Sequence, residues 1–332
     1  MAVLYIQEQG VRVGKRNHQV LVQRGKEVLQ EVPLGKVDQV VLMGRGVQMS
    51  TALLVELMQR GIPVILTNQR GSRHYVTLTG SPSRFGELRS QQVFFVHDEA
   101  RSLEMARAIV QAKLVNQRVL LAQTGWAAAP GAVGQIDAAL ARVAGATTVE
   151  VVRGYEGAAA AAYFGAWRAM LPAEWGFQGR AFYPPPDPVN ALLSFGYTLL
   201  LHDVITAVQV TGLDPYLGTF HVMEPGRPSL ALDLMEEFRP LVVDRLVLEV
   251  IGRALMTRAR FERPSQRQEA VYLDAKGREV LVEAYEGVMQ SRVPLPSGEH
   301  TLLRRVVLLQ AYAVARVMRG EQEGYVGYVY GH

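Results

Sequence analysis

The first 80 residues consist of short apolar runs separated by turns that contain glycine. The runs are VLYIQ, VRVGKRN, HQVLVQ, KEVLQEV, VDQVVLMG, PVILTN and HYVTLTG. Their length and β-branched residues are typical of strands, and the Arg24–Gly25 step between two of them predicts a hairpin turn. Between about Ser50 and Arg60 the leucines recur at helical spacing instead, and Ser50 can cap that helix. The pattern predicts a small β-rich domain with one helix.

After about Arg89 the apolar period changes to 3.6 residues, the repeat of a helix. This period predicts helices over residues 98–123, 135–144, 147–171, 188–210, 229–256 and 302–319. The stretch 271–285, VYLDAKGREVLVEAY, predicts either a local hairpin or a strand that leads into a helix. We therefore predict an α+β fold, in which a β-rich domain over residues 1–90 precedes a larger, mainly α-helical domain over residues 91–320. The boundary is expected between residues 85 and 95.

The C-terminal residues 321–332, EQEGYVGYVYGH, are rich in glycine and tyrosine. Such a composition at a chain end predicts a flexible tail outside the core. Alternatively, its tyrosines could stack on bases or dock on a partner chain.

Composition narrows the class of protein. The chain has 332 residues, 49% hydrophobic and 20% charged, which is typical of a folded protein and excludes extensive disorder. It contains no cysteine, so disulfides, a cysteine-ligated zinc site and a thiol nucleophile are excluded. We find no secretory signal at the N-terminus, and the uncharged stretch between Arg118 and Asp137 is too rich in glycine and polar residues to span a membrane. We expect a cytoplasmic protein with no membrane contact.

Charge is distributed unevenly along the chain. The net charge is +4, but residues 1–90 carry 12 Lys or Arg against 6 Asp or Glu, whereas the remainder carries 23 against 25. Arginine outnumbers lysine by 30 to 5, and the guanidinium group suits bidentate contacts to phosphate. The basic surplus therefore belongs to the β-rich domain.

The sequence lacks the local motifs of P-loop, dinucleotide-binding, serine-hydrolase and zincin proteins. A first candidate site residue is Glu156, in the segment VVRGYEGAAAAAYFGAW. The five alanines that follow it leave little side-chain volume, so another element or a ligand can approach the carboxylate closely. The simpler alternative is a solvent-facing glutamate paired with Arg153, three residues earlier.

A second group of polar residues lies in the segment GLDPYLGTFHVMEPGRPSLALDLMEEFRP. His221 is in a loop rich in glycine and proline, and the helix that follows carries Asp233, Glu236 and Glu237. Asp233 and Glu236 are three residues apart and share a helix face. Carboxylates beside a histidine are typical ligands of Mg²⁺ or Mn²⁺. The same acids could instead form a solvated face paired with Arg239.

A third segment, GRAFYPPPDPVNALLSFGYTLL, places polar residues on one stripe of an apolar helix. These residues are Asn190, Ser194 and Tyr197, and Asp187 is expected to cap the helix that begins at Pro188. The stripe indicates a wet groove.

Together these motifs resemble one family. The order RGYEGAAAAAYF, PPDPVNALLSFGYTLL, GLDPYLGTFH and GRPSLALDLMEEFRP is similar to that of the CRISPR-associated adaptation integrase, the metal-dependent subunit of the spacer-acquisition complex. The segments LGKVDQVVLMGRG and RGIPVILTNQRG resemble the β-rich domain of that family, so the resemblance covers nearly the whole chain.

The resemblance implies a set of site residues. The metal ligands of the family fall on Glu156, His221 and Glu236, and Asp233 matches a further acidic position of the active site. Glu237 leaves open which of two adjacent acids is the third ligand. The implied cofactor is Mn²⁺ or Mg²⁺. The DNA-binding residues implied by matching segments are Arg180, Asn190, Tyr197 and Arg227.

The resemblance also implies a reaction and partners. A DNA 3′-hydroxyl attacks a phosphodiester of a CRISPR array, and the enzyme also cleaves nucleic acids; His221 would act as a ligand or, alternatively, as a general base. Implied partners are double-stranded DNA, a second copy of the chain held through the β-rich domain, and a small ferredoxin-like CRISPR-associated adaptation subunit. Two other classes stay open: a metal-dependent hydrolase of other nucleic acids, and a non-catalytic DNA-binding scaffold.

Overall fold

The computed structural model describes residues 3–44, 46–68, 74–80, 85–181, 184–264 and 269–330. The chain divides into two compact units, Met1–Glu87 and Leu88–His332. This division falls inside the interval of residues 85–95 in which the sequence places the boundary.

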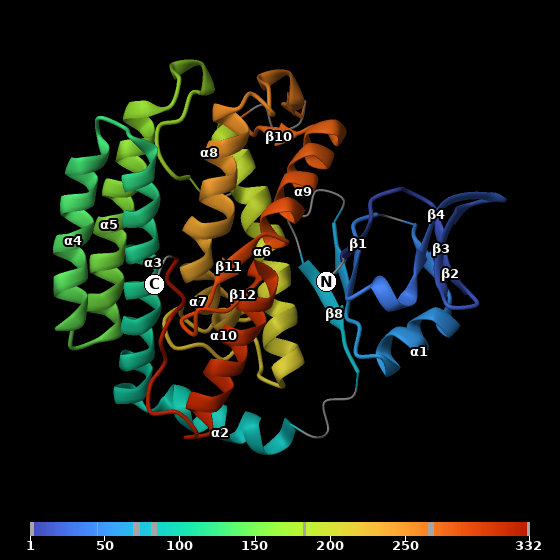
Figure 1. The fold of residues 1–332 in the computed structure, drawn as a ribbon, viewed down its shortest axis with the longest axis horizontal. Coiled ribbons are helices and arrows are strands. Elements are labelled where there is room, and N and C mark those ends of the chain that lie inside the picture. Colours follow the sequence, from blue (N-terminus) through green and yellow to red (C-terminus); the bar gives the residue numbers. More distant parts are fainter. Residues whose placement is uncertain are drawn as a thin grey trace. The chain divides into compact units, whose positions relative to one another are not determined.

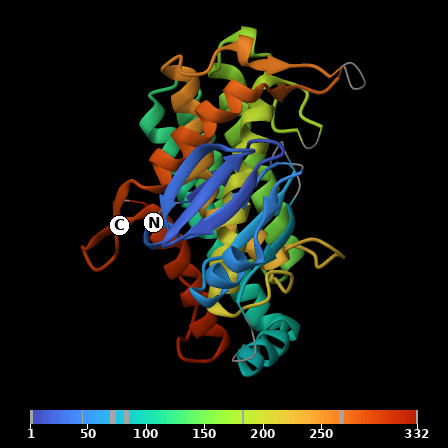
Figure 2. The same cartoon turned by 90° about the vertical axis from the view of Figure 1, so that its right-hand side faces the viewer.

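The first unit contains two four-stranded sheets. One has the order β1-β5-β7-β8 and consists of β1 (Val3–Ile6), β5 (Gln39–Leu42), β7 (Val64–Thr67) and β8 (His74–Leu78). The other has the order β4-β3-β2-β6 and consists of β2 (Arg12–Arg16), β3 (Gln19–Arg24), β4 (Glu27–Pro33) and β6 (Gln48–Met49), seen in blue in Figure 2. The predicted hairpin joins β3 to β4, and Gly25 adopts the positive φ of +61° that the turn requires.

Helix α1 (Thr51–Gln59) completes this unit. The hydroxyl of Ser50 accepts a hydrogen bond from the backbone N–H of Leu53, which confirms the predicted cap. Leu53 and Leu57 are fully buried and belong to the same apolar core as Ile6 and Val13 of the strands.

The second unit is mainly helical. Its long elements are α2 (Gly86–His97), α3 (Glu99–Thr124), α4 (Ala129–Ala144), α5 (Val149–Met170), α6 (Pro188–Thr211), α7 (Ser229–Phe238), α8 (Arg245–Gly252), α9 (Ala275–Met289) and α10 (Leu303–Met318). Two short strand pairs, β9 (Phe261–Glu262) with β10 (Tyr272–Leu273) and β11 (Arg292–Pro294) with β12 (His300–Leu302), join these helices. Helices α3, α4 and α5 pack side by side (Figure 1).

Most predicted helices are confirmed, with three differences. Helix α2 was not predicted, because its buried face at Leu88, Gln92 and Phe95 includes a glutamine that binds the carbonyls of the loop after α6. Helix α4 begins six residues before the predicted start. The predicted helix 229–256 is interrupted by a π-helical turn over Arg239–Asp244, where Pro240 lacks the N–H that a regular α-helix needs.

Two open expectations are resolved by the structure. The stretch 271–285 forms strand β10 and then helix α9, not a hairpin of its own. The expectation that the C-terminal tail lies outside the core is wrong for Tyr325 and Tyr328, which are 7% and 5% exposed. The tail is held because the side-chain amide of Asn116 donates to the carbonyl of Tyr328 and accepts from the N–H of Tyr330.

Helix α6 is the core helix of the second unit. It is long and apolar enough to cross a membrane by length and composition, but 83% of its apolar window is buried inside the protein. Its N-terminus is capped by Asp187, whose carboxylate accepts the N–H of Asn190, as the sequence predicts. The capped helix thereby fixes the positions of the polar stripe formed by Asn190, Ser194 and Tyr197.

Candidate active site

The three predicted metal ligands converge on one cavity of about 540 Å³ in the helical unit. Glu156 comes from α5, His221 from the loop between α6 and α7, and Glu236 from α7. One wall is built from residues with little or no side chain, namely Gly157, Ala160, Ala161 and Gly165. The small residues of α5 thus leave space beside Glu156, as the sequence predicts.

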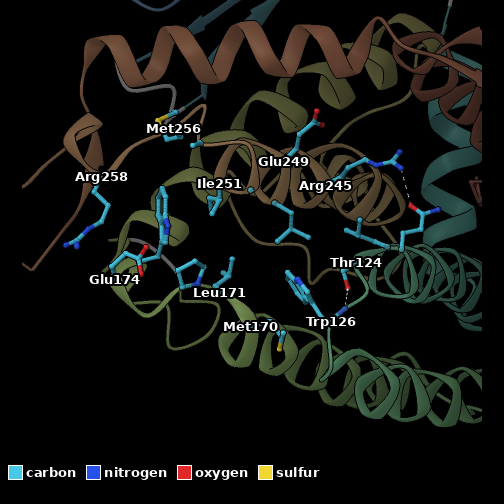
Figure 3. A pocket seen from close by; sticks show the side chains of 17 residues that line it. Thr124, Trp126, Met170, Leu171, Glu174, Arg245, Glu249, Ile251, Met256 and Arg258 are labelled. Atoms are coloured by element: carbon cyan, nitrogen blue, oxygen red, sulfur yellow. Dashed lines mark hydrogen bonds between the residues drawn. The ribbon is translucent and has the colours of Figure 1, made fainter.

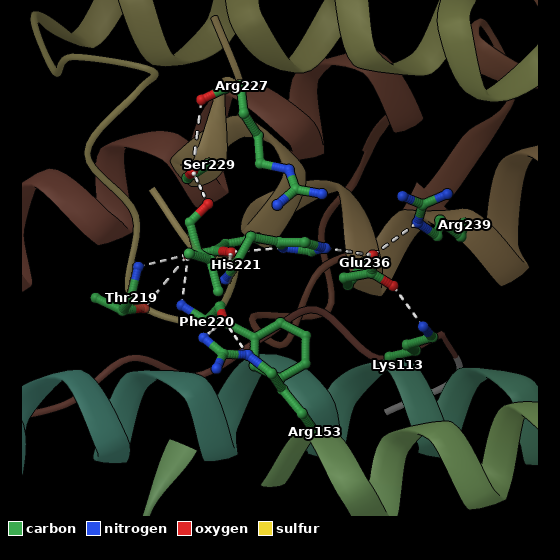
Figure 4. A network of polar contacts seen from close by, with 11 residues as sticks. Lys113, Arg153, Thr219, Phe220, His221, Arg227, Ser229, Glu236 and Arg239 are labelled. Atoms are coloured by element: carbon green, nitrogen blue, oxygen red, sulfur yellow. Dashed lines mark hydrogen bonds and ion pairs between the residues drawn. The ribbon is translucent and has the colours of Figure 1, made fainter. Parts of the chain in front are cut away.

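Glu236 is the most buried of the three, with 4% of its surface exposed. Its Oε1 accepts a hydrogen bond from Nε of Arg239 at 2.9 Å, and its Oε2 lies 2.5 Å from Nζ of Lys113 (Figure 4). Burial alone would raise the pKa of Glu236, but the positive charges of Arg239 and Lys113 outweigh it and hold the pKa at about 2. Glu236 is therefore ionised near neutral pH.

Lys113 connects two of the predicted ligands. Its Nζ lies 2.5 Å from Oε1 of Glu156, the same distance as from Glu236. Burial lowers the pKa of Lys113, but the two carboxylates raise it above its ordinary value, so the ammonium group stays charged. The simpler alternative for Glu156 is wrong, because Arg153 donates to the carbonyl of Phe220 and to Glu150 instead.

The imidazole of His221 is oriented by Asp233. The carboxylate of Asp233 is fully buried and accepts the backbone N–H groups of Thr219, Phe220 and His221 at 2.6, 2.9 and 2.7 Å. Nδ1 of His221 lies 2.8 Å from Oδ1 of Asp233, which leaves Nε2 on the cavity side, 3.7 Å from Glu236. A carboxylate that accepts Nδ1–H holds the tautomer whose Nε2 is free to accept a proton or bind a metal. Asp233 thus positions His221 and is not part of the cavity lining.

The adjacent acids Glu236 and Glu237 point to different places. Glu237 is fully buried; its Oε1 accepts the hydroxyl of Tyr325 at 2.8 Å and its Oε2 accepts the N–H of Tyr328 at 2.9 Å. Burial raises the pKa of Glu237 to about 8, although these hydrogen bonds lower it in part. Glu236 is therefore the acid that lines the cavity, and Glu237 holds the C-terminal tail.

The four predicted DNA-binding residues separate into two groups. Arg180 lines the cavity, and its guanidinium lies 5.4 Å from the ring centre of Tyr197. Arg227 is 40% exposed and pairs with Glu224 at 3.0 Å. Asn190 is fully buried, with its amide bound to the backbone at Gly179 and to Asp187 and Arg180, and the hydroxyl of Tyr197 donates to Asp244 at 2.5 Å.

Burial leaves Asn190 without a surface for direct DNA contact, whereas Tyr197 still lines the cavity. Asn190 has no exposed surface, and Tyr197 is 8% exposed. Asn190 anchors Arg180, and the ring of Tyr197 lies against the guanidinium groups of Arg180 and Arg239.

Sequence reasoning missed Lys113, Arg168 and Asp244, which also line the cavity. Asp244 ends the π-helical turn and accepts the hydroxyls of Tyr163 and Tyr197; burial raises its pKa to about 6, although both hydrogen bonds lower it. Lys113 could have been found, because it lies on the predicted apolar stripe of α3, where a charge requires a partner. The sequence offers no comparable signal for Asp244, whose environment depends on the π-helical turn.

A larger cavity, of about 890 Å³, lies at the end of α5 and along α8 (Figure 3). Most of its lining is apolar, and its charged residues are Glu174, Arg245, Glu249 and Arg258. It contains no histidine and none of the predicted site residues. The smaller cavity is therefore the better candidate for the active site, because it holds the residues that can do chemistry.

Comparison with known proteins agrees with this architecture. A family model described as CRISPR associated protein Cas1 matches residues 4–287. The chain belongs to the Cas1 family. It is 34% identical to CRISPR-associated endonuclease Cas1 3 of Thermus thermophilus over 335 residues, covering 98% of this chain and 96% of that protein. The family resemblance drawn from the four motifs is thereby confirmed.

Two solved structures share the fold of this Cas1-family chain. A casposase bound to integration product superimposes with a TM-score of 0.84 at 20% identity, covering 98% of this chain and 93% of that one. A chain of a Cas6-RT-Cas1–Cas2 complex gives a TM-score of 0.83 at 22% identity and covers 100% of this chain and 36% of that one. The predicted α+β class is confirmed.

The residues that line the cavity are of the types that bind a divalent cation. Two carboxylates and one imidazole suit Mg²⁺ or Mn²⁺. Among the described residues, however, no group of three or more His, Cys, Asp or Glu side chains is arranged to hold a metal ion as it stands. In this structure the ammonium group of Lys113 makes ion pairs with both Glu156 and Glu236.

Proposed function

We propose that this chain is a divalent-metal-dependent DNA endonuclease and integrase that inserts new spacers into a CRISPR array. The observation that carries the proposal is the convergence of Glu156, His221 and Glu236 on one cavity in a chain of the Cas1 family. The names of similar proteins support it, because a relative is a CRISPR-associated endonuclease and a structure of the same fold is a casposase bound to integration product.

In this proposal Glu156, His221 and Glu236 would hold Mn²⁺ or Mg²⁺, which would supply Lewis-acid stabilisation of negative charge on the scissile phosphate. The reaction exchanges one phosphodiester bond for another: a DNA 3′-oxygen bonds to phosphorus as the former ester oxygen leaves. No external energy source is needed, because one P–O bond forms as one breaks. The same site cleaves DNA when water replaces the 3′-hydroxyl.

The remaining residues of the cavity bind and orient the DNA. Asp233 keeps Nε2 of His221 directed at the site. Arg180 supplies positive charge at the cavity wall, and Arg168, which makes no hydrogen bond or ion pair within the described part of the chain, supplies a second guanidinium for phosphate. Such contacts recognise the backbone of DNA and not its sequence.

The proposal extends to partners. We infer that the chain works on double-stranded DNA as a homodimer, together with a small ferredoxin-like CRISPR-associated adaptation subunit. The match to a Cas1–Cas2 complex supports the second protein partner. The surplus of basic residues in the first 90 residues supports an electrostatic contribution of the β-rich unit to DNA affinity.

A strand-transfer assay on three single variants tests the proposal. Glu156→Ala, His221→Ala and Glu236→Ala should each abolish Mn²⁺-dependent joining of a 3′-hydroxyl duplex to a repeat-containing target. DNA affinity should stay within a few-fold, because phosphate contacts lie mainly elsewhere. Glu283→Ala, an exposed glutamate on α9, is the matched control and should keep both activities.

The outcomes separate the proposal from its alternatives. Cleavage without strand transfer in the parent protein would indicate a hydrolase of other nucleic acids. Strand transfer that survives His221→Ala at full rate would remove the metal-site assignment. Unchanged activity in all three variants would indicate a DNA-binding scaffold.

A further inference from the structure

Lys113 occupies a distinctive position in the cavity. Its ammonium comes from α3 and lies 2.5 Å from one oxygen of Glu156 on α5 and 2.5 Å from one oxygen of Glu236 on α7. The side chains of Lys113 and Glu236 are 9% and 5% exposed, so little water reaches this contact. One positive charge therefore joins the two carboxylates that the proposed function assigns to the metal.

A divalent cation would need the same carboxylate oxygens. Oε1 of Glu236 already accepts Nε of Arg239, so Oε2, the oxygen in contact with Lys113, is the one left for a second cation. Two cations that share buried carboxylates repel each other strongly, because the surroundings screen charge poorly. The ammonium group and the ion cannot both occupy this point.

Of the two cations next to Glu236, Lys113 is the one that can move away. Arg239 is held on both sides, by Glu236 and by the ring of Tyr197, whose centre lies 4.5 Å from the guanidinium carbon. Lys113 has a flexible four-carbon stem and lines the open cavity. A change of side-chain rotamer along this stem is the smallest movement that would displace its ammonium group.

We propose that Lys113 is a built-in counterion that occupies the cation position of the active site and is displaced when the divalent ion binds; this inference rests on the proposed function. Without metal, Lys113 holds Glu156 and Glu236 together and prevents their mutual repulsion. With metal, the ion takes over that role. Lys113 thus sets how tightly the site binds its cation and acts as a positioning residue.

Direct measurement of Mn²⁺ binding tests this inference without an activity assay. Mn²⁺ is added to the parent chain and to the variants Lys113→Met and Lys276→Met. The electron paramagnetic resonance signal of free Mn²⁺ then gives the amount bound by each protein. Lys276 pairs with Glu279 on the exposed surface of α9 and is the matched control. We expect Lys113→Met to bind Mn²⁺ roughly tenfold more tightly, because a competing charge is removed, and Lys276→Met to match the parent.

A second measurement uses the parent chain and does not depend on the stability of a variant. An amine-acylating reagent is applied with and without saturating Mn²⁺, and labelled lysines are located by mass spectrometry. Labelling of Lys113 should rise several-fold with Mn²⁺, because the displaced ammonium is freed from its two carboxylates, whereas labelling of Lys276 should not change.

The results distinguish failure of the inference from failure of the proposed function. If the parent chain binds Mn²⁺ and Glu236→Gln abolishes that binding, the metal site stands. Unchanged or weaker binding by Lys113→Met, or labelling of Lys113 that does not rise, then overturns the counterion role alone. If the parent chain binds no Mn²⁺ at this site, the proposed function itself fails.

Discussion

Glu237→Gln should change the pH dependence of stability in the helical unit. Glu237 is fully buried and accepts hydrogen bonds from the hydroxyl of Tyr325 and the N–H of Tyr328. Its pKa rises from 4.5 to about 8, mainly through burial. A glutamine presents one acceptor and one donor, the pattern of a protonated glutamate, and cannot ionise.

The sign and size of the effect follow from this pKa. Between about pH 4.5 and 8 the folded chain keeps a proton that the unfolded chain has released, so the stability of the parent chain falls as pH rises. The slope is at most about 1.4 kcal/mol per pH unit, and the full loss of about 5 kcal/mol is reached only once the pH has risen above the folded pKa of about 8. Glu237→Gln lacks this loss and should be more stable than the parent by roughly 3 kcal/mol at pH 7.

Urea unfolding between pH 5 and 8, followed by tryptophan fluorescence, measures this difference. All three tryptophans, at positions 126, 167 and 175, lie in the second unit, so the signal reports on that unit. Glu283→Gln, on the exposed face of α9, is the control and should run parallel to the parent. A free-energy difference between Glu237→Gln and the parent that stays constant across this range would refute the reasoning.

Three further predictions follow. Gly218→Ala should lower the free energy of unfolding by about 1–3 kcal/mol and reduce DNA cleavage, because the new Cβ would lie 2.6 Å from the Asp233 carboxylate that orients His221. Urea unfolding and a nuclease assay measure the two effects, and a stability and cleavage rate equal to those of the parent would contradict the prediction. Asn116→Ala should release the C-terminal tail, so that limited proteolysis after residue 320 becomes faster than in the parent; an unchanged cleavage rate would contradict it. DNA affinity should fall with salt by a slope of about −0.9 per phosphate neutralised. A folded chain that starts at Gly86 should show a shallower slope, and light scattering gives its oligomeric state, because loss of the dimer would also make the slope shallower. An equal slope would place the DNA-binding surface wholly in the helical unit.

The fold could be predicted from the sequence mainly where apolar residues recur at the spacing of a strand or of a helix. Strands β1 to β5, β7 and β8 and helices α3, α5, α6 and α10 were located to within about two residues of their ends, whereas the two-residue strand β6 was not predicted. Helix α2 was missed because Gln92 is buried for its hydrogen bonds and not for its hydrophobicity. Periodicity cannot detect a polar residue whose partners lie some 120 positions away in the chain.

The site could be predicted only as a set of residue types. The motifs brought out Glu156, His221 and Glu236, and the structure places all three at one cavity. Spacing could not choose between Glu236 and Glu237, because residues three and four positions after Asp233 both lie near its helix face. The choice depends on what packs against each side of α7, and that is tertiary information.

The three acids of α7 connect this short helix to several other parts of the second unit. Asp233 gathers the loop that carries His221, Glu236 meets Lys113 and Arg239, and Glu237 holds the tail. The contacts with the His221 loop, with Lys113 and with the tail join α7 to three different parts of the chain, so a rotation of α7 that improved one of them would break the other two. The orientation of α7 is therefore over-determined. The ammonium group of Lys113 can move without loss of this orientation, because Asp233 and Glu237 still join α7 to the His221 loop and to the tail.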